Sequence, residues 1–305
     1  MSPVKMPKRR TCAQMVVHEL LAETHPEYRQ RRLDAEEETH RSIDSGKAMR
    51  VAEKLITIPV VVHVVHRTDE ENISDAQVKS QIDALNRDYR AKNADKSKVP
   101  AAWKGLLIDS NIQFALATKD PNGKKTSGIT RTVTKATSFS VQNEVKSSKT
   151  GGVDPWPTDR YMNFWACNLG EGLLGYAQFP GGPSLTDGVV ILFKAFGTTG
   201  VVKTPYDKGR TATHEVGHFL GLRHIWGDMN DCSGSDFVAD TPKARESNFG
   251  KPKFPHITCN NGPNGDMFMN YMDYVDDAAM FMFTAGQVAR MNATLAGPRK
   301  NLANA

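Results

Sequence analysis

The stretch THEVGHFLGLRH, residues 213–224, constrains this chain more than any other part of its sequence. His214 and His218 are four residues apart, so on an α-helix their side chains lie on one face, one turn apart. Two imidazoles placed in this way bind a single zinc ion, and Glu215 lies beside the first, where it would act on a zinc-bound water. The stretch therefore predicts a metal-binding helix with a general base next to the metal.

A third histidine, His224, cannot reach the same ion if the helix continues, because six further residues carry it about 9 Å along the helix axis. Gly221 lies between, and glycine readily adopts the left-handed conformation that ends a helix. We therefore predict that the helix ends at Gly221 and that His224 folds back as the third ligand. Three protein ligands leave one coordination position open, which is the arrangement of a catalytic zinc.

The full spacing HExxHxxGxxH is the signature of the metzincin peptidases, which also have a methionine turn beneath the metal. In this chain NYMDY, residues 270–274, follows the histidines, so we expect Met272 to be the methionine of that turn. Its side chain would give the metal site an apolar, polarisable floor. By the same resemblance, the hydroxyl of Tyr274 contacts the metal or stabilises the oxyanion of the transition state.

Further segments resemble the pappalysin-type metzincins, the cytophagalysin and ulilysin-like branch. These segments are NFWACNLGEGLLGYAQFPGG, THEVGHFLGLRHIWGD, DFVADTP, NYMDYVDD and FTAGQVARM, within about residues 160–295. Asp228, which closes the second segment, fits the HExxHxxGxxH–D arrangement of that branch. The resemblance implies a zinc-dependent endopeptidase, made as a zymogen, in which Glu215 takes the proton of the attacking water.

The resemblance also indicates where a polypeptide substrate binds. An extended substrate would add a strand beside the edge strand at 173–179, next to Leu174, Gly175 and Tyr176. In family members that cut before arginine, a carboxylate three residues after the tyrosine of the methionine turn lines the S1′ pocket. Asp277 occupies that position and would pair with Arg, or Lys, at P1′. A solvated loop aspartate is the alternative.

The region after the zinc motif carries two structural expectations from the same resemblance. The family has a disulfide at the positions of Cys232 and Cys259, and a reduced pair is the alternative. The intervening GSDFVADTP resembles the calcium loop of the family, with hard oxygen ligands from Asp236, Asp240 and Thr241. An Asx-type turn is the alternative there. Cys167 has no evident partner and is expected to be a buried thiol.

The first part of the chain, residues 1–49, is polar and rich in charge, and shows little that could bury a core. We interpret it as a pro-segment. Cys12 is a lone cysteine in RRTC, and a thiolate is a good zinc ligand, so Cys12 could fill the open coordination position until maturation. An incidental free thiol is the alternative. If Asp277 selects arginine, self-cleavage before Arg41 or Arg50 would release the segment.

The order of the expected elements predicts an α+β fold. Strands are expected at 55–66, 111–118, 160–169 and 187–193, and helices at 75–93 and 283–295, besides the zinc helix. The resemblance implies a metzincin-type zincin, with a mixed five-stranded sheet and an active-site helix above an irregular C-terminal subdomain. The expected divisions are a pro-segment, 1–49, an N-terminal catalytic subdomain, 50–224, and a C-terminal subdomain, 225–305.

Composition excludes other classes of function. The net charge is +5 and the charges are scattered, without a basic patch that would bind nucleic acid. No apolar run is long enough to span a membrane, and no Sec-type signal peptide is visible, although the resemblance implies a secreted monomer. Two alternatives remain, a metzincin of different specificity and a catalytically silent zinc-dependent binding protein. The presence of both Glu215 and Tyr274 argues against the second.

Overall fold

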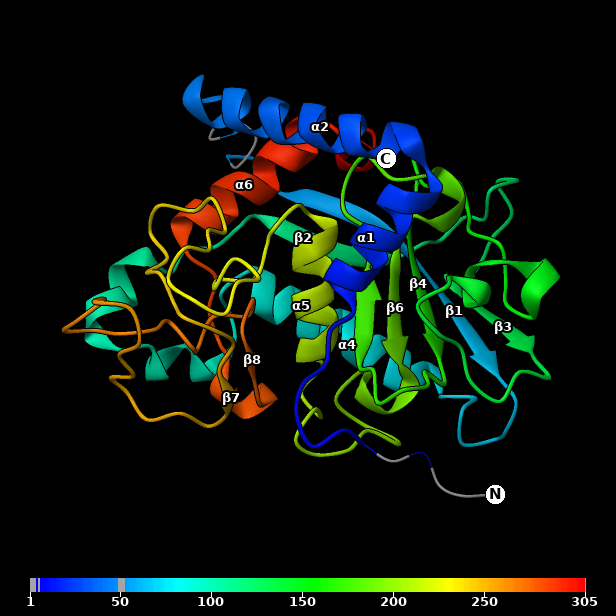
Figure 1. Ribbon diagram of the computed structural model, residues 1–305. Helices are drawn as coiled ribbons and strands as arrows, with labels where there is room; N and C mark the ends of the chain where they lie inside the picture. The colour runs from blue at the N-terminus through cyan, green and yellow to red at the C-terminus, as the bar shows by residue number, and fades with distance from the viewer. Residues whose placement is uncertain (1–3, 5, 49–52, 305) are drawn as a thin grey trace.

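The computed structural model describes residues 4, 6–48 and 53–304 (Figure 1). The strands are β1 Ile56–His66, β2 Ile112–Leu116, β3 Ile129–Val133, β4 Met162–Cys167, β5 Gly175–Ala177, β6 Val189–Leu192, β7 Phe249–Gly250 and β8 Tyr274–Val275. The α-helices are α1 Gln14–Thr24, α2 Pro26–Asp44, α4 Asp75–Tyr89, α5 Arg210–Phe219 and α6 Ala285–Ala296. Short 3-10 helices are η1 Ala94–Lys98, η2 Ala101–Leu106, η3 Glu144–Lys146, η4 Ser148–Thr150, η5 Ser184–Thr186, η6 Phe193–Ala195, η7 Asp277–Ala279 and η8 Leu302–Asn304.

The main sheet is mixed and runs in the order β2-β1-β4-β6-β5, with β3 also paired to β1. Strands β2 and β3 pair with successive halves of one edge of β1, because β4 occupies the other edge. The sheet is therefore five positions wide, as predicted, although six strands build it. β1 to β4 and β6 are parallel, and only β5 is antiparallel to its neighbour, β6. The long run of β-branched residues in β1 is buried on both faces, as is typical of parallel strands.

The helices α4 and α5 position the zinc motif against this sheet. α5 lies in front of the sheet and contacts β5 and β6, and α4 packs against both α5 and β2 (Figure 1). The hydroxyl of Ser74 accepts a hydrogen bond from the Gln77 N–H and caps the start of α4. The helix ends at Tyr89, four residues before the predicted end, because Ala91 has a left-handed φ of +46°.

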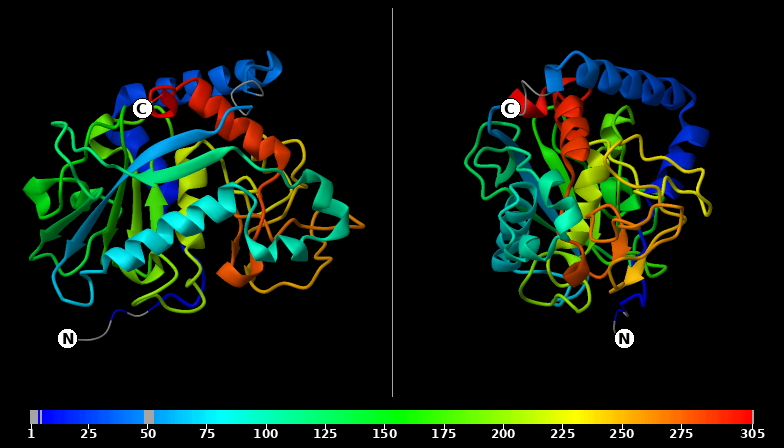
Figure 2. Two further views of the ribbon diagram at one scale, coloured as in Figure 1. Left: turned by 180° about the vertical axis from the view of Figure 1, so that it is seen from behind. Right: turned by 90° about the vertical axis from the view of Figure 1, so that its left-hand side faces the viewer.

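The pro-segment packs more closely on the rest of the chain, residues 53–304, than its composition predicts. These residues are called the body below. α1 contacts β5, and α2 crosses the top of the molecule over α6 in all three views (Figures 1 and 2). Val17, Leu21 and Tyr28 are buried and join the main core. The expectation that this segment buries little was therefore wrong. The buried apolar side chains face the rest of the chain, whereas Val16 and Leu33 and most of the charged side chains are exposed.

Between α5 and α6 the chain is irregular, as expected, with β7 and β8 as a two-stranded sheet. The predicted disulfide joins Cys232 and Cys259, with 5.7 Å between the Cα atoms. Cys167 is a buried free thiol in β4. No helix in the described part of the chain has the length and hydropathy that a membrane crossing requires.

Candidate metal centre and substrate cleft

The zinc helix α5 ends where the chain must turn to bring the third histidine back. Phe219 is its last residue, and Gly221 follows with a φ of +89°, in the left-handed region that favours glycine. The reversal brings the Nε2 atom of His224 within 3.1 Å of the Nε2 atom of His218, which is also 3.1 Å from that of His214. Two nitrogens bound to one tetrahedral zinc lie about 3.3 Å apart, so these donors fit a shared metal ion.

The other ring nitrogen of each histidine is engaged elsewhere, which fixes its orientation. The Nδ1 atom of His214 lies 2.7 Å from the Tyr271 carbonyl oxygen, and that of His218 lies 2.9 Å from the Leu222 carbonyl oxygen. A carbonyl accepts a proton, so both Nδ1 atoms are donors and both Nε2 lone pairs face the metal site. These close Nε2 contacts are therefore metal-ligand spacing and not hydrogen bonds.

His224 is oriented by a carboxylate and an indole. Its Nδ1 atom lies 2.5 Å from an Asp228 carboxylate oxygen. The ring of Trp226 stacks on His224, with 4.3 Å between centroids and 9° between planes, and also contacts the Tyr274 ring at 4.7 Å. Sequence reasoning did not single out Trp226, although the stretch HIWGD contains it. The third ligand is thus fixed from two sides.

Cys12 of the pro-segment lies at this site. Its Sγ atom and one nitrogen from each of the three histidines all lie within 4.8 Å of one another, the one such ligand group among the described residues. The thiol donates to Glu215 Oε2 at 3.4 Å, and the Cys12 carbonyl oxygen accepts a hydrogen bond from the Tyr274 hydroxyl at 3.3 Å. Burial raises the pKa of the Glu215 carboxyl to about 8. One residue of the pro-segment therefore contacts the metal ligands, the candidate base and the candidate oxyanion donor.

The pro-segment continues along the edge of β5 as an added strand. The Leu174 N–H donates to the Thr11 carbonyl at 3.1 Å, and the Ala13 N–H donates to the Gly175 carbonyl at 3.1 Å. A side chain at Gly175 would place its Cβ 3.0 Å from Glu215 Cγ, so glycine keeps this edge close to the candidate base. The backbone groups at the edge of β5 thus pair with an extended segment of chain.

Tyr176, the third residue expected at the substrate strand, faces the other way. Its side chain is fully buried, and its hydroxyl donates to the Ser140 carbonyl at 3.3 Å. The structure therefore places this side chain in the core and leaves only its backbone on the substrate side.

Asp277 is fully buried, and this carboxylate together with the groups that surround the Arg10 side chain is called the Asp277 pocket below. One carboxylate oxygen accepts hydrogen bonds from the N–H groups of Lys208 and Arg210, at 2.8 and 3.3 Å. The other accepts from Nη2 of Arg10 at 2.6 Å. The Arg10 guanidinium also donates to the Val275 carbonyl at 3.2 Å. An arginine side chain from the pro-segment thus fills this pocket. Arg10 is part of RRTC, but the sequence did not predict its contact with Asp277.

Arg210, at the start of α5, supports the same pocket from behind. Its guanidinium donates to the Asp277 carbonyl at 2.6 Å and forms a bidentate pair with Asp95, at 2.7 and 2.6 Å. Sequence reasoning missed both Arg210 and Asp95, because more than one hundred residues separate the two.

Met272 is fully buried beneath the histidines. A Cβ atom added at Gly217 of α5 would overlap the Met272 sulfur. Glycine in the middle of a helix is unfavourable by about 1 kcal/mol relative to alanine, so its presence here reflects this close approach. Gly217 was not singled out, although its place inside HEVGH marks it.

The expected calcium ligands make hydrogen bonds within the protein. Asp236 accepts from the hydroxyl of Thr241 at 2.8 Å. Asp240 accepts from the Thr284 hydroxyl at 2.6 Å and from the Gly286 N–H at 2.8 Å, at the start of α6. The carboxylates of Asp236 and Asp240 therefore interact with different partners in this structure.

Known proteins with similar sequences and structures are metallopeptidases. Residues 146–296 match the family model Peptidase M43, described as pregnancy-associated plasma protein-A. An extracellular metalloprotease of Arthroderma otae is 34% identical over 244 residues, which are 77% of this chain and 76% of the relative. A promirolysin mutant of Tannerella forsythia is 49% identical, with a TM-score of 0.88 over 97% of this chain and 98% of that one. Mature mirolysin of the same organism, in complex with a cleaved peptide, is 53% identical, with a TM-score of 0.80 over 82% of this chain and 97% of that one.

Proposed function

The chain belongs to the Peptidase M43 family of zinc metalloproteases, and on this premise we propose that its mature form cleaves polypeptides on the amino side of arginine. The predicted resemblance to pappalysins is confirmed, and with it the assignment as a zinc endopeptidase. Selectivity for arginine, with lysine as a weaker substrate, is the proposal.

The main support for arginine selectivity is the Arg10 side chain, which occupies the Asp277 pocket in the latent chain. Arg10 is 2% exposed, and its guanidinium reaches the carboxylate, a backbone carbonyl and the Thr211 hydroxyl, at 2.6, 3.2 and 3.1 Å. The face of Tyr206 lies 5.1 Å from the guanidinium carbon. In the latent chain the pocket matches the charge, length and donor positions of the Arg10 side chain. It would therefore offer the same partners to a substrate arginine at P1′.

Each of the remaining residues of the site has a separate role in peptide-bond hydrolysis. Zinc, when bound by the three histidines, supplies a Lewis acid that polarises the scissile carbonyl and makes water more acidic. Glu215 accepts the proton of the attacking water and passes it to the leaving amine. The Tyr274 hydroxyl, freed from the Cys12 carbonyl, donates to the oxygen that becomes negatively charged. Asp228 keeps the third histidine in place.

The substrate pairs with the edge of β5 in place of the pro-segment. The backbone groups of Leu174 and Gly175 that bind residues 11 and 13 in the latent chain would bind the substrate backbone. The pro-segment runs parallel to β5 at Cys12, whereas strand addition to this edge is equally open to an antiparallel chain.

Maturation removes residues 1–49 in this proposal, which leaves subdomains 50–224 and 225–305 on either side of the cleft. Promirolysin matches 97% of this chain and mature mirolysin 82%, and the difference, 15% of 305 residues, is about 46 residues. Of the two expected cleavage points, Arg41 lies inside helix α2, whereas a peptidase that adds its substrate to a strand needs an extended segment. Arg50 lies outside the described residues. We therefore favour cleavage after α2.

Three further properties belong to the proposal. The relatives that resemble this chain are named extracellular metalloproteases, which supports action outside the cell. A calcium ion at the 234–242 loop would bind Asp236, Asp240 and Thr241, and would replace their present hydrogen bonds with oxygen ligation. The enzyme would act as a monomer.

The experiment is a map of every bond that the purified mature enzyme cuts in a denatured protein, read by mass spectrometry. Parallel digests contain a zinc chelator or the variant Glu215→Ala. We expect cuts before arginine that both controls abolish. Chelator-sensitive cuts spread over other P1′ residues would remove the Asp277 assignment and leave the peptidase.

A further inference from the structure

Two arginines of the body lie under α2 with their guanidinium groups only partly satisfied. Arg290 of α6 is 2% exposed, and its Nη2 atom donates to Glu36 of the pro-segment at 2.5 Å and to the Gly221 carbonyl at 3.4 Å. Nε and Nη1 of Arg290, and Nε of the nearby Arg223, have no hydrogen-bond partner among the described residues. Buried donors of this kind are costly without an acceptor.

Glu36 is the acceptor that the latent chain supplies. Among the described residues, Glu36–Arg290 is the one ion pair between α2 and the body. Burial acts to raise the pKa of Glu36, yet the charge of Arg290, followed by those of Arg32 and Arg223, lowers it below its usual value. In the body, Asp236 is close enough to Arg290 for an electrostatic interaction, but the two residues form no ion pair.

The two arginines share an aromatic platform. The guanidinium carbons of Arg223 and Arg290 lie 4.7 and 6.0 Å from the centre of the Phe237 ring, which is 45% exposed. From the pro-segment, the ring of His40 contacts the same phenyl ring at 6.2 Å. Two guanidinium groups held over one phenyl ring form a positively charged surface that can bind an anionic group.

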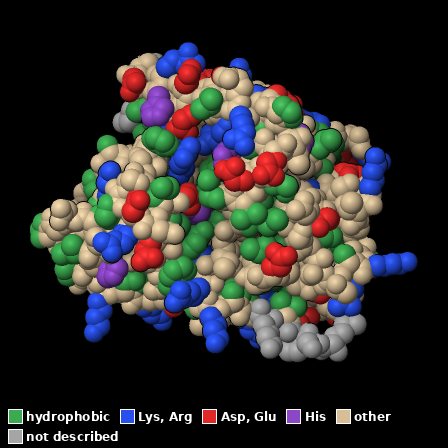
Figure 3. Space-filling view, in the orientation of Figure 1, with side chains coloured by type: hydrophobic (Ala, Val, Ile, Leu, Met, Phe, Trp, Pro, Cys, Tyr) green, Lys and Arg blue, Asp and Glu red, His purple; other side chains and the backbone are tan. Residues whose placement is uncertain are grey.

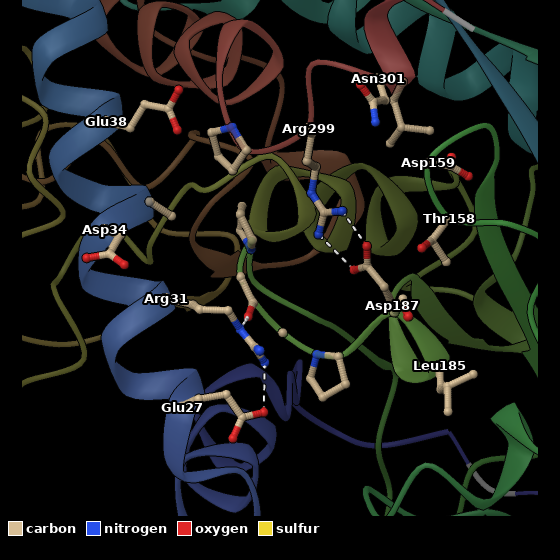
Figure 4. Close-up of a pocket in the computed structure, with 18 residues that line it drawn as sticks. Glu27, Arg31, Asp34, Glu38, Thr158, Asp159, Leu185, Asp187, Arg299 and Asn301 are labelled. Carbon is tan, nitrogen blue, oxygen red and sulfur yellow. Dashed lines mark hydrogen bonds and ion pairs between the residues drawn. The ribbon is translucent and has the colours of Figure 1, made fainter.

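The adjacent part of the α2 interface is different in character. A cavity of about 690 Å³ lies between α2, the loop at 180–187 and the C-terminal segment (Figure 4). Both arginines that line it are paired within the protein, since Arg299 binds Asp187 and Arg31 binds Glu27. It offers no unpaired buried donor, so the arginine cluster is the stronger candidate for a binding site.

The path of the chain places this cluster relative to the scissile bond. Arg10 fills the P1′ pocket and Cys12 lies at the metal, so α1 and α2, which follow, cover the opposite, non-primed side. Figure 1 shows α1 running from α5 toward α2 at the top, and Figure 3 shows Lys and Arg side chains gathered on the front face just below α2.

We propose that Arg290 and Arg223 form a subsite of the mature enzyme that binds a carboxylate side chain of the polypeptide substrate, on the non-primed side of the scissile bond. Release of the pro-segment removes Glu36 and leaves Arg290 without its counter-ion. An Asp or Glu of the substrate restores the charge-assisted hydrogen bond that Glu36 accepted from Arg290. The subsite rests on the peptidase activity and is independent of the preference at P1′.

The test uses the mature enzyme and a peptide with one mapped cut site. Glu or Gln is placed in turn at each non-primed position, and kcat/KM is measured for each pair. We expect one position, or two adjacent ones, at which Glu exceeds Gln by about fivefold to tenfold through a lower KM. Arg290→Gln should abolish this difference, so that the Glu and Gln peptides are cleaved with equal kcat/KM. Arg87→Gln, an exposed arginine of α4, is the matched control and should retain it.

The proposal is overturned if no position gives a ratio above about two in the parent enzyme, or if the ratio persists in both Arg290→Gln and Arg223→Gln. Thermal unfolding shows whether Arg290→Gln is folded. If it is not folded, two other measurements test the proposal. The Glu-to-Gln ratio of kcat/KM should be lost in Arg223→Gln, and in the parent enzyme it should fall from low to high salt. Because the peptide carries a bond that the enzyme is known to cut, loss of the arginine preference at P1′ would not alter this comparison.

Discussion

Replacement of Arg10 by methionine should open the latent site, and the structure gives the size of the effect. The side-chain stem keeps its volume, but Asp277 loses its charged partner inside a fully buried pocket. Breaking a buried ion pair costs about 3–5 kcal/mol. Two backbone N–H donors still bind Asp277, so we expect the lower figure, about 3 kcal/mol, which is about a 100-fold change in the equilibrium for undocking.

The thiol of Cys12 reports that equilibrium, because it reacts only when the pro-segment leaves the cleft. The zymogen variant Glu215→Ala, which cannot process itself, is treated with a thiol reagent, and the labelling rate is compared with and without Arg10→Met. Cys167 is buried in β4 and contributes no rapid signal. Arg10→Lys, which keeps the charge but not the fork of donors, should give an intermediate rate.

A double-mutant cycle identifies the cause. In an Asp277→Asn background, Arg10→Met should have a much smaller effect, because no carboxylate is left uncompensated. Labelling within about threefold of the parent rate, or an equal increase in both backgrounds, would refute the claim that this ion pair holds the pro-segment in the cleft.

Three further changes have definite expected outcomes. Cys12→Ala should shorten the time to maturation severalfold, measured by gel electrophoresis, and latency equal to that of the parent would rule out a cysteine switch. Gly217→Ala should lower the free energy of unfolding by about 1–3 kcal/mol in thermal melts, despite the better helix propensity of alanine, because its Cβ overlaps the methionine-turn sulfur. Burial and then the charge of Arg32 lower the pKa of His18, so the docked segment prefers neutral His18, and acidification through about pH 6.5 favours undocking. Cys12 labelling, corrected for intrinsic thiol reactivity, should therefore rise less on acidification in His18→Phe than in the parent.

The metal site was predictable because most of it is local. Four of its determinants, His214, His218, Gly221 and His224, lie within eleven residues. Helix geometry relates the first two, and the left-handed turn at the glycine accounts for the return of the third histidine. The sheet was predictable for the same reason in β1, whose β-branched run is continuous. β3, ITRTV, was not, because this exposed strand has no buried face of its own and forms only by pairing with β1.

The contacts that close the cleft were not predictable from any pattern. Arg10 and Asp277 are 267 residues apart, and Glu36 and Arg290 are 254 apart. Asp277 was expected to bind an arginine of the substrate, but Arg10, Glu36 and Arg290 look like ordinary surface charges in the sequence, and only the fold shows the two pairs. The burial of Tyr28 was missed for a related reason, since one aromatic among many charges gives no periodic signal.

The central claim is that Asp277 recognises the guanidinium of a P1′ arginine, and a matched peptide pair tests it most directly. One peptide has arginine at P1′ and the other has citrulline, which has the same shape without the charge. For the mature enzyme we expect kcat/KM to favour arginine by about 100-fold, and Asp277→Asn to reduce that ratio to near one. Asp276→Asn, the neighbouring carboxylate, should leave it unchanged. An arginine preference that survives Asp277→Asn, or equal cleavage of both peptides by the parent, would contradict the account.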